Sequence, residues 1–192
     1  MEELNGIEIR PFASQAVWEA WLAKNAGRTE GVWIKIAKKA SGIPTITHGE
    51  ALDVALCYGW IDGQSKSLDD TWYLQKFTPR RPRSMWSKIN IGKVAELTAA
   101  GKMQPQGMAE VAAAKADGRW DAAYASPANA EVPPEFIEAF KTNKKAQAFF
   151  ESLNKTNRYA FIWRVVTARK PETRAARVAK LLTMLENGET FH

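Results

Sequence analysis

Cysteine and histidine are scarce in this sequence of 192 residues, which has one cysteine, Cys57, and two histidines, His48 and His192. A single cysteine cannot form a disulfide within the chain. So few thiol and imidazole ligands exclude a zinc or haem site of the usual spacing. We therefore expect no metal site and no cofactor. Because Cys57 lies in an apolar helical stretch, it is expected to be a buried, unreactive thiol.

Long apolar runs are also missing. No run approaches the roughly 20 residues that a helix needs to cross a bilayer. Residues 1–5 are acidic and have no apolar core after them, unlike a secretory signal. We therefore expect a cytoplasmic protein without membrane insertion. The composition, with 45% hydrophobic and 25% charged residues, predicts a folded globular chain.

The common catalytic signatures are absent from the sequence. It contains no Walker loop, no Gly-x-Gly-x-x-Gly and no Gly-x-Ser-x-Gly elbow. A nucleophile–histidine–acid triad would have to use His48, which lies inside a predicted helix cap. No reaction is therefore indicated by a motif, and we expect a protein that is not an enzyme.

Charge is unevenly distributed along the chain, although the net charge is only +6. Residues 76–102 hold seven basic side chains and one acidic, and residues 140–192 hold eleven basic and four acidic. The segments 1–75 and 103–139 are net negative. Two uses of this alternation stay open: complementary surfaces that meet within the molecule, or binding of an external anion.

The front part of the chain alternates between helix and strand signals, and its ordered part is expected to begin at Pro11. Helix caps, periodic apolar residues and turn residues set the bounds of each element. The expected elements are a helix from Ser14 to Asn25, a strand over residues 31–37, a helix from the Thr47–Glu50 capping box to Gly59, a hairpin over residues 60–66 and 71–78, and a proline-rich loop over residues 79–83.

Only helices are expected after that loop. Apolar residues recur at helical spacing, and prolines and glycines mark the ends. The expected helices run from Ser87 to Gly101 and from Pro105 to Gly118, and four more follow, one around Phe136 and three that begin after Asn143, after Asn154 and at Pro171.

These elements predict an α+β protein: a small antiparallel sheet with helices in the N-terminal part, followed by a C-terminal helical bundle. The predicted domains are an α+β domain over residues 1–125 and a helical domain over residues 135–192. The Pro- and Ala-rich stretch 126–134 is the expected linker. The oligomeric state cannot be read from the sequence.

The most promising segment for function runs from Trp60 to Lys88, because it combines acids, an amide, aromatic rings and a cluster of cations. Guanidinium groups bind phosphate or carboxylate with two hydrogen bonds, and aromatic rings beside arginines can stack on bases. The candidate ligand-binding residues are Trp60, Asp62, Gln64, Arg80, Arg81, Arg83, Trp86 and Lys88.

A structural role is an equally open interpretation of the same residues. Trp60 and Trp72 can be the core of the hairpin, and Asp62-Gly63 can be a turn or bulge. The arginines can pair with Asp62, Asp69 and Asp70 inside the molecule. The second basic stretch, between Arg164 and Lys180, is typical of a solvated helical face, with nucleic-acid contact as the alternative.

Several segments together form a recognisable pattern. They are Gly31–Lys39, Glu50–Gln64 and Phe77–Asn90, and in the tail Tyr159, Trp163, Lys170–Arg174, Arg177 and Leu185–Gly188. In these segments, which span most of the chain, the sequence resembles the bacterial YdeI/OmpD-associated (bacteriocin-protection) family. The resemblance implies a cytoplasmic factor of stress or antimicrobial tolerance, without a settled reaction, cofactor or catalytic residue.

Three functional hypotheses follow, in order of preference. The first is a non-enzymatic module that binds an anionic small molecule or a nucleic acid at the loop from Arg80 to Lys88. The second is a protein-interaction factor whose tail docks a partner through Phe149, Phe150 or Trp163. The third is an enzyme that uses Asp62 as a base and the loop arginines as electrostatic stabilisers.

Overall fold

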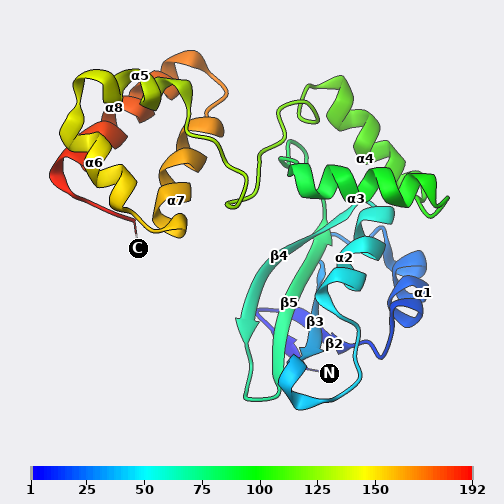
Figure 1. Ribbon diagram of the computed structural model, residues 1–192. Helices are drawn as coiled ribbons and strands as arrows, with labels where there is room; N and C mark the ends of the chain where they lie inside the picture. The colour runs from blue at the N-terminus through cyan, green and yellow to red at the C-terminus, as the bar shows by residue number, and fades with distance from the viewer. Residues whose placement is uncertain (1, 192) are drawn as a thin grey trace. The chain divides into compact units, whose positions relative to one another are not determined.

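The computed structural model describes residues 2–191, which divide into two units (Figure 1). The first unit holds the described residues up to Trp86 together with Asn90–Ala122. The second holds Ser87–Ile89 and the described residues from Ala123 onward. The predicted domain boundaries and the linker over residues 126–134 stay predictions.

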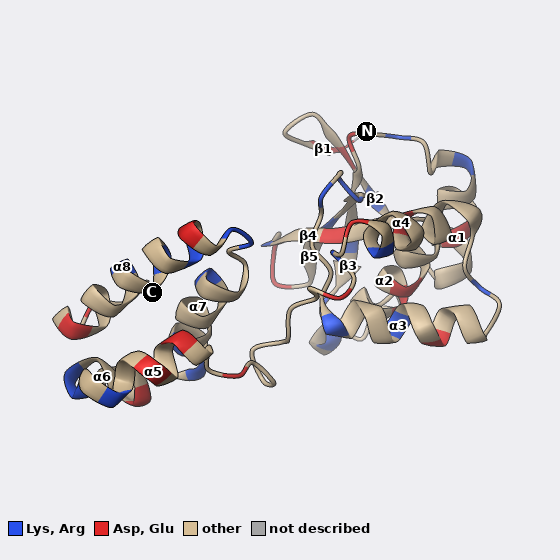
Figure 2. Ribbon diagram, turned by 90° about the horizontal axis from the view of Figure 1, so that it is seen from above, with Lys and Arg blue, Asp and Glu red and all other residues tan. Residues whose placement is uncertain are grey.

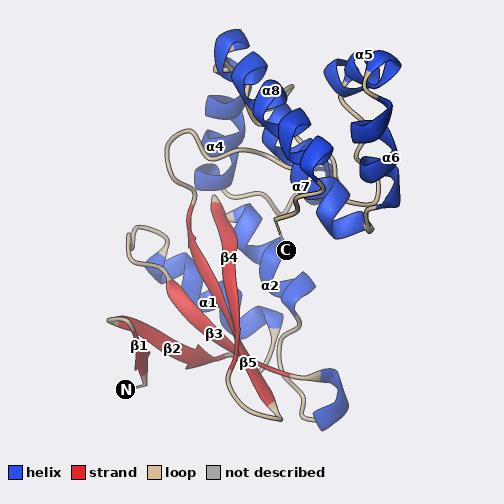
Figure 3. Cartoon of the chain, turned by 90° about the vertical axis from the view of Figure 1, so that its left-hand side faces the viewer, coloured by secondary structure: helices blue, strands red, loops and turns tan. Residues whose placement is uncertain are grey.

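A five-stranded sheet forms the centre of the first unit, with the strand order β1-β2-β3-β5-β4 (Figure 3). The strand β2 pairs with β3 in parallel, and the other pairs are antiparallel. The sheet is therefore mixed, and the predicted antiparallel sheet is corrected on this point. The strands are β1 (Glu3–Leu4), β2 (Ile7–Pro11), β3 (Val32–Ala37), β4 (Trp60–Ser67) and β5 (Trp72–Pro79).

The ordered part begins before Pro11, because β1 precedes this residue and β2 ends at it. The strand β2 carries charged residues, which hid it in the sequence. Glu8 on this strand is 8% exposed, and its carboxylate accepts hydrogen bonds from Arg10 and Arg28. Burial raises the pKa of Glu8, but these two hydrogen bonds outweigh it, and the pKa lies below its usual value.

Helices α1 (Gln15–Asn25) and α2 (His48–Cys57) cover one face of the sheet (Figures 1 and 3). Ser14 caps α1 by accepting from the Val17 N–H, and α2 begins with the predicted capping box of Thr47 and Glu50. Both caps are confirmed. The remaining helical elements are the short 3₁₀ helix η1 (Lys39–Ser41), α3 (Lys88–Ala99) and α4 (Pro105–Ala116).

Aromatic side chains make up much of the core between α1, α2 and the sheet. Trp18 and Trp60 are both almost fully buried, with ring centres 6.4 Å apart, and Trp18 also lies 5.7 Å from the ring of Phe77. The indole N–H of Trp60 donates to the carbonyl of Ala26 at 3.2 Å. This packing fixes the start of β4 against α1.

The second unit is the predicted helical bundle, with α5 (Pro134–Thr142), α6 (Lys144–Ser152), α7 (Lys155–Val166) and α8 (Pro171–Asn187). Asn143 caps α6 and Asn154 caps α7, as the sequence indicates. The core is largely aromatic and aliphatic, with Phe136, Phe140, Phe150, Phe161, Val165, Leu181 and Leu185 buried. Among residues 2–191, no helix is long and apolar enough to cross a membrane.

Candidate functional site: a basic cleft beside the hairpin

A cleft of about 310 Å³ lies in the first unit beside the hairpin of β4 and β5. It combines two cationic side chains with an amide and two hydroxyl groups. Its lining residues are Ile61, Gly63, Gln64, Lys76, Thr78, Pro79, Arg81 and Ser84. All of them come from β4, from β5 and from the loop that follows β5.

A break in the hairpin register shapes one wall of the cleft. Asp62 pairs with Phe77 and Ser65 pairs with Gln75, so the strands shift between these two pairs. Such a bulge leaves part of a strand unpaired and re-aims its side chains. The side chain of Gln75 is 5% exposed and donates to the carbonyls of Gly63 at 2.9 Å and Gln64 at 3.3 Å. Gln75 therefore fixes the bulge from inside.

Two buried arginines hold the loop that forms the opposite wall. Arg80 is 5% exposed and donates from Nη2 to the carbonyl of Met85 at 2.7 Å. Arg119 is 4% exposed and donates from Nη1 to the carbonyl of Ser84 at 3.0 Å. The Ser84 N–H in turn donates to the carbonyl of Arg81 at 2.9 Å. The loop is thus set in one shape before any ligand arrives.

The three arginines of the loop have different positions. The guanidinium of Arg80 stacks on Trp86, and Trp86 is buried against Trp120 with ring centres 5.0 Å apart. Arg81 is exposed and lines the cleft. Arg83 is exposed too, has a positive φ of 67°, and does not line the cleft. Within residues 2–191, we find no hydrogen bond or ion pair from the side chains of Arg81 or Arg83.

The other predicted site residues are distributed as follows. Gln64 is exposed and lines the cleft, whereas Trp60 is buried in the core at 1% exposure. Asp62 forms a hydrogen bond with His48, with Oδ2 and Nε2 3.0 Å apart. Lys88 belongs to the second unit, where its N–H donates to the carbonyl of Tyr124 at 2.8 Å.

Asp62 therefore does not line the cleft, although its neighbours Ile61 and Gly63 do. Because successive side chains of a strand point to opposite faces, Asp62 faces His48 at the start of α2. The carboxylate therefore contacts α2 and does not line the cleft that Arg81 borders. The sequence placed His48 in a helix cap and gave no sign of this partner, which is 14 residues away along the chain.

One acid of the hairpin turn, Asp69, accepts hydrogen bonds within the turn itself. The carboxylate of Asp69 accepts from the N–H groups of Thr71 and Trp72, each at 2.8 Å. These backbone hydrogen bonds lower the pKa of Asp69 and close the turn. The ion pair between Asp69 and the loop arginines, one of the open alternatives, is not what holds this carboxylate.

Lys76, Thr78 and Ser84 are the cleft residues with polar side chains that were not among the candidates from the sequence. Lys76 and Thr78 are two positions apart on β5, so both side chains lie on the cleft face of the strand. This two-residue period of a strand is the feature of the sequence that could have identified them. The chemistry of the lining is that of an anion site: ammonium and guanidinium donors with hydroxyl and amide groups beside them. In the part of the chain that the structure describes, no cluster of histidine, cysteine or acidic residues could hold a metal ion.

Comparisons with known proteins give two family matches. Residues 10–110, which contain the whole cleft, match a domain family of unknown function, DUF8412. Residues 129–188 match the bacteriocin-protection family of YdeI or OmpD-associated proteins. No curated protein and no solved structure matches the chain.

The second match confirms the resemblance seen in the sequence, at its C-terminal segments. The front segments that also carried the resemblance fall within the first match. Since that match spans more than half of the 192 residues, the chain belongs to the DUF8412 domain family, and its residues 129–188 match the YdeI/OmpD-associated, bacteriocin-protection family.

Proposed function

We propose that this chain is a cytoplasmic, non-enzymatic binding protein of antimicrobial or stress tolerance, and that its front unit binds a small anion in the basic cleft. The single observation that carries the proposal is the convergence of Lys76 and Arg81 on one cleft. Both cations stand beside the side chains of Gln64, Thr78 and Ser84. Phosphate or carboxylate is the group that this set of donors fits.

The rigidity of the walls supports the proposal. Gln75 fixes the bulge, and Arg80 and Arg119 fix the loop. A site whose walls are held by buried hydrogen bonds loses little conformational entropy on binding. In this proposal Arg80, Trp60 and Trp86 shape the site, whereas Arg81 and Gln64 contact the ligand.

The protein-interaction hypothesis has less support, because it needs exposed aromatic side chains on the helical unit. Phe150 is buried at 2% exposure, and Phe149 packs against the core of the bundle. Trp163 is half-buried and borders two pockets of the second unit. A flat aromatic docking surface from all three residues is therefore not formed.

The enzymatic hypothesis loses its basis in proximity. It requires Asp62 near the loop arginines, whereas Asp62 bonds to His48 and does not line the cleft that Arg81 borders. A His–Asp pair alone, without a nucleophile or a cleft between its members, does not define a reaction.

The proposal is tested by calorimetric titration of the full chain with pyrophosphate, a nucleoside monophosphate and a short single-stranded oligonucleotide, at low and moderate salt. We expect a small phosphate to bind. The variant Arg81→Gln should weaken it about tenfold, which corresponds to the roughly 1.4 kcal/mol of a charge-assisted hydrogen bond. The variant Lys76→Gln should weaken it to a similar degree.

Arg83→Gln is the matched control, because Arg83 belongs to the same loop and has the same charge but does not line the cleft. It should change the affinity less than about twofold. Equal losses in Arg81→Gln and Arg83→Gln would indicate a diffuse basic field and contradict a site in the cleft. Binding of the oligonucleotide alone would favour a nucleic-acid surface instead.

A further inference from the structure

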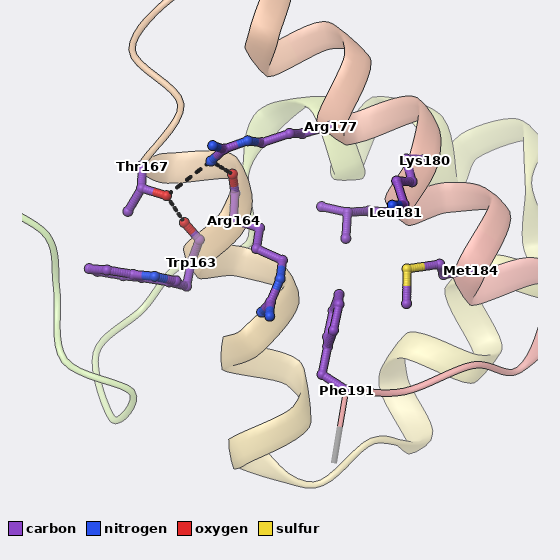
Figure 4. A pocket seen from close by; sticks show the side chains of 8 residues that line it. All are labelled: Trp163, Arg164, Thr167, Arg177, Lys180, Leu181, Met184 and Phe191. Carbon is purple, nitrogen blue, oxygen red and sulfur yellow. Dashed lines mark hydrogen bonds between the residues drawn. The ribbon is translucent and has the colours of Figure 1, made fainter.

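A second pocket, of about 480 Å³, lies within the helical unit between α7, α8 and the segment after α8 (Figure 4). It has no residue in common with the basic cleft, and all of its residues belong to the second unit. Its lining residues are Trp163, Arg164, Thr167, Arg177, Lys180, Leu181, Met184 and Phe191.

One side of this pocket is apolar. Leu181 and Met184 point into it from α8, and the ring of Phe191 stands opposite them (Figure 4). Leu181 is 3% exposed, and the Phe191 ring packs on Phe161 of the bundle core with centres 4.9 Å apart. The apolar wall is therefore continuous with the core and firmly placed.

The other side is cationic and largely preset. The guanidinium of Arg164 lies 3.5 Å from the ring centre of Phe191 and donates to the carbonyl of Ala160 at 2.7 Å. Arg177 donates from Nη1 to the carbonyl of Arg164 at 2.9 Å and to Oγ1 of Thr167 at 3.3 Å (Figure 4). These contacts hold both guanidinium groups at the pocket.

Part of this arrangement serves the fold. The carbonyls near the end of α7 lack partners within the helix, and Arg177 satisfies one of them. That hydrogen bond uses one nitrogen of Arg177. Lys180 does not cap a helix in this way. It is exposed, and among residues 2–191 we find no hydrogen bond or ion pair from its ammonium group. Its charge at the pocket is unexplained by helix capping.

The charge balance of the lining is one-sided. Three cations border the pocket, and none of its lining residues is acidic. Figure 2 marks both basic and acidic positions on the surrounding helices, so the one-sided charge belongs to the lining of the pocket itself. Like charges gathered beside an apolar wall repel one another, and an anion between them relieves that repulsion.

We propose that this pocket binds a small organic anion with an apolar body, such as an aromatic or aliphatic sulfonate, carboxylate or phosphate. The body lies on Leu181, Met184 and Phe191, and the anionic group meets Arg177 and Lys180. A volume of about 480 Å³ lies within the range of small-molecule sites.

A neighbouring pocket of the same unit suggests that the apolar part of the ligand is an aromatic ring. It measures about 380 Å³ and shares Trp163 and Arg164 with the first. Its wall is aromatic, since the ring of Tyr124 stands edge-on to Trp163 with centres 4.5 Å apart, and Tyr159 lies 6.0 Å from the same indole. A flat ring on Trp163 therefore finds aromatic partners on one side and cations on the other.

The test uses a matched pair of fluorescent probes: anilinonaphthalene sulfonate and the neutral phenylnaphthylamine, which lacks the sulfonate. We expect the sulfonate to bind the folded full-length chain at least about fivefold more tightly than the neutral probe. Lys180→Gln should weaken the sulfonate about fivefold and leave the neutral probe unchanged. Met184→Ser should weaken both probes alike.

Lys145→Gln is the control, because Lys145 is an exposed lysine on α6 of the same unit that does not line either pocket. It should leave both affinities unchanged. Equal binding of the two probes, or the same loss in Lys180→Gln and Lys145→Gln, would overturn the proposal. So would an oligonucleotide that displaces the sulfonate and is weakened equally by both substitutions, since that result describes a diffuse nucleic-acid surface.

Discussion

The guanidinium carbon of Arg80 lies 3.7 Å from the ring centre of Trp86. Both residues are buried, and Arg80 also donates to the carbonyl of Met85. A cation over an indole face is stabilised by the ring quadrupole, most strongly where water is excluded. The stack therefore fixes the residues between Arg80 and Trp86, among them the cleft residues Arg81 and Ser84.

The first prediction concerns this stack. Arg80→Met keeps much of the side-chain bulk but leaves the Met85 carbonyl without its donor, so the free energy of unfolding should fall by about 2–4 kcal/mol. Arg83→Met, on the exposed turn of the same loop, should change it by less than about 0.5 kcal/mol. Urea denaturation of the two variants checks the contrast. Similar small changes in both would show that the stack contributes little.

Local interactions explain which elements could be predicted from the sequence. The caps at Ser14, Thr47, Asn143 and Asn154 were predictable because each bonds a backbone N–H only three residues away. The hairpin was predictable for the same reason. The strand β2 was not, because its parallel pairing with β3 joins residues far apart in the chain.

The candidate site was predictable only in part. From the sequence, Arg80, Arg81 and Arg83 were equivalent candidates. Their burial depends on tertiary packing, which the local sequence does not reveal. In the structure Arg80 is buried, Arg81 is exposed and lines the cleft, and Arg83 is exposed and does not line it. Lys76 joins the cleft from β5, and only the register of the hairpin brings it there.

The second prediction compares two helix glycines. A Cβ on Gly107 of α4 would lie 2.2 Å from the carbonyl oxygen of Cys57, because α4 runs against the end of α2 at this point. Gly107→Ala should therefore lower the free energy of unfolding by about 2 kcal/mol or more, despite the better helix propensity of alanine.

Gly92 of α3 is the control for this prediction, since a Cβ there meets nothing within 4 Å. Gly92→Ala should raise the free energy of unfolding by about 0.5–1 kcal/mol. Thermal and urea unfolding of both variants measure the difference. A stabilising Gly107→Ala would mean that the two helices separate without cost.

The third prediction concerns the pH dependence set by Cys57. Burial raises the pKa of this thiol to about 11, and the charges of Glu19 and Asp53 add to the shift. In the unfolded chain the thiol ionises near its usual value, whereas in the folded protein it stays protonated to a higher pH. Its contribution to stability is therefore complete below about pH 8.5 and is lost as the pH rises toward 11.

Cys57→Ala removes this contribution. Between pH 8 and pH 10.5 the free energy of unfolding of the unsubstituted chain should fall by about 1–2 kcal/mol more than that of Cys57→Ala. Urea denaturation at the two pH values measures both slopes. Parallel slopes would show that the thiol ionises equally in the folded and unfolded states.

The fourth prediction concerns an ion pair within the helical unit. Arg174 of α8 binds Glu135 of α5 through two hydrogen bonds, one of them from Nη2 at 3.1 Å. The hydrogen bond from Arg174 lowers the pKa of Glu135 below its usual value of 4.5. A carboxyl whose pKa is lowered on folding stabilises the protein above its unfolded pKa, and this stabilisation is lost as the pH falls.

Glu135→Gln should therefore lower the free energy of unfolding by about 0.5–1 kcal/mol at pH 7, a value reduced by the partial exposure of both side chains. The difference from the unsubstituted chain should shrink as the pH falls through the lowered pKa of Glu135, because the carboxyl is then protonated in both states. Glu138→Gln breaks a pair with Lys141 on the same helix, and both of those side chains are mostly exposed. It should change the stability by less than about 0.3 kcal/mol, because solvent screens that pair. If the two substitutions cost the same at pH 7, the contact between α5 and α8 adds nothing beyond an ordinary surface pair.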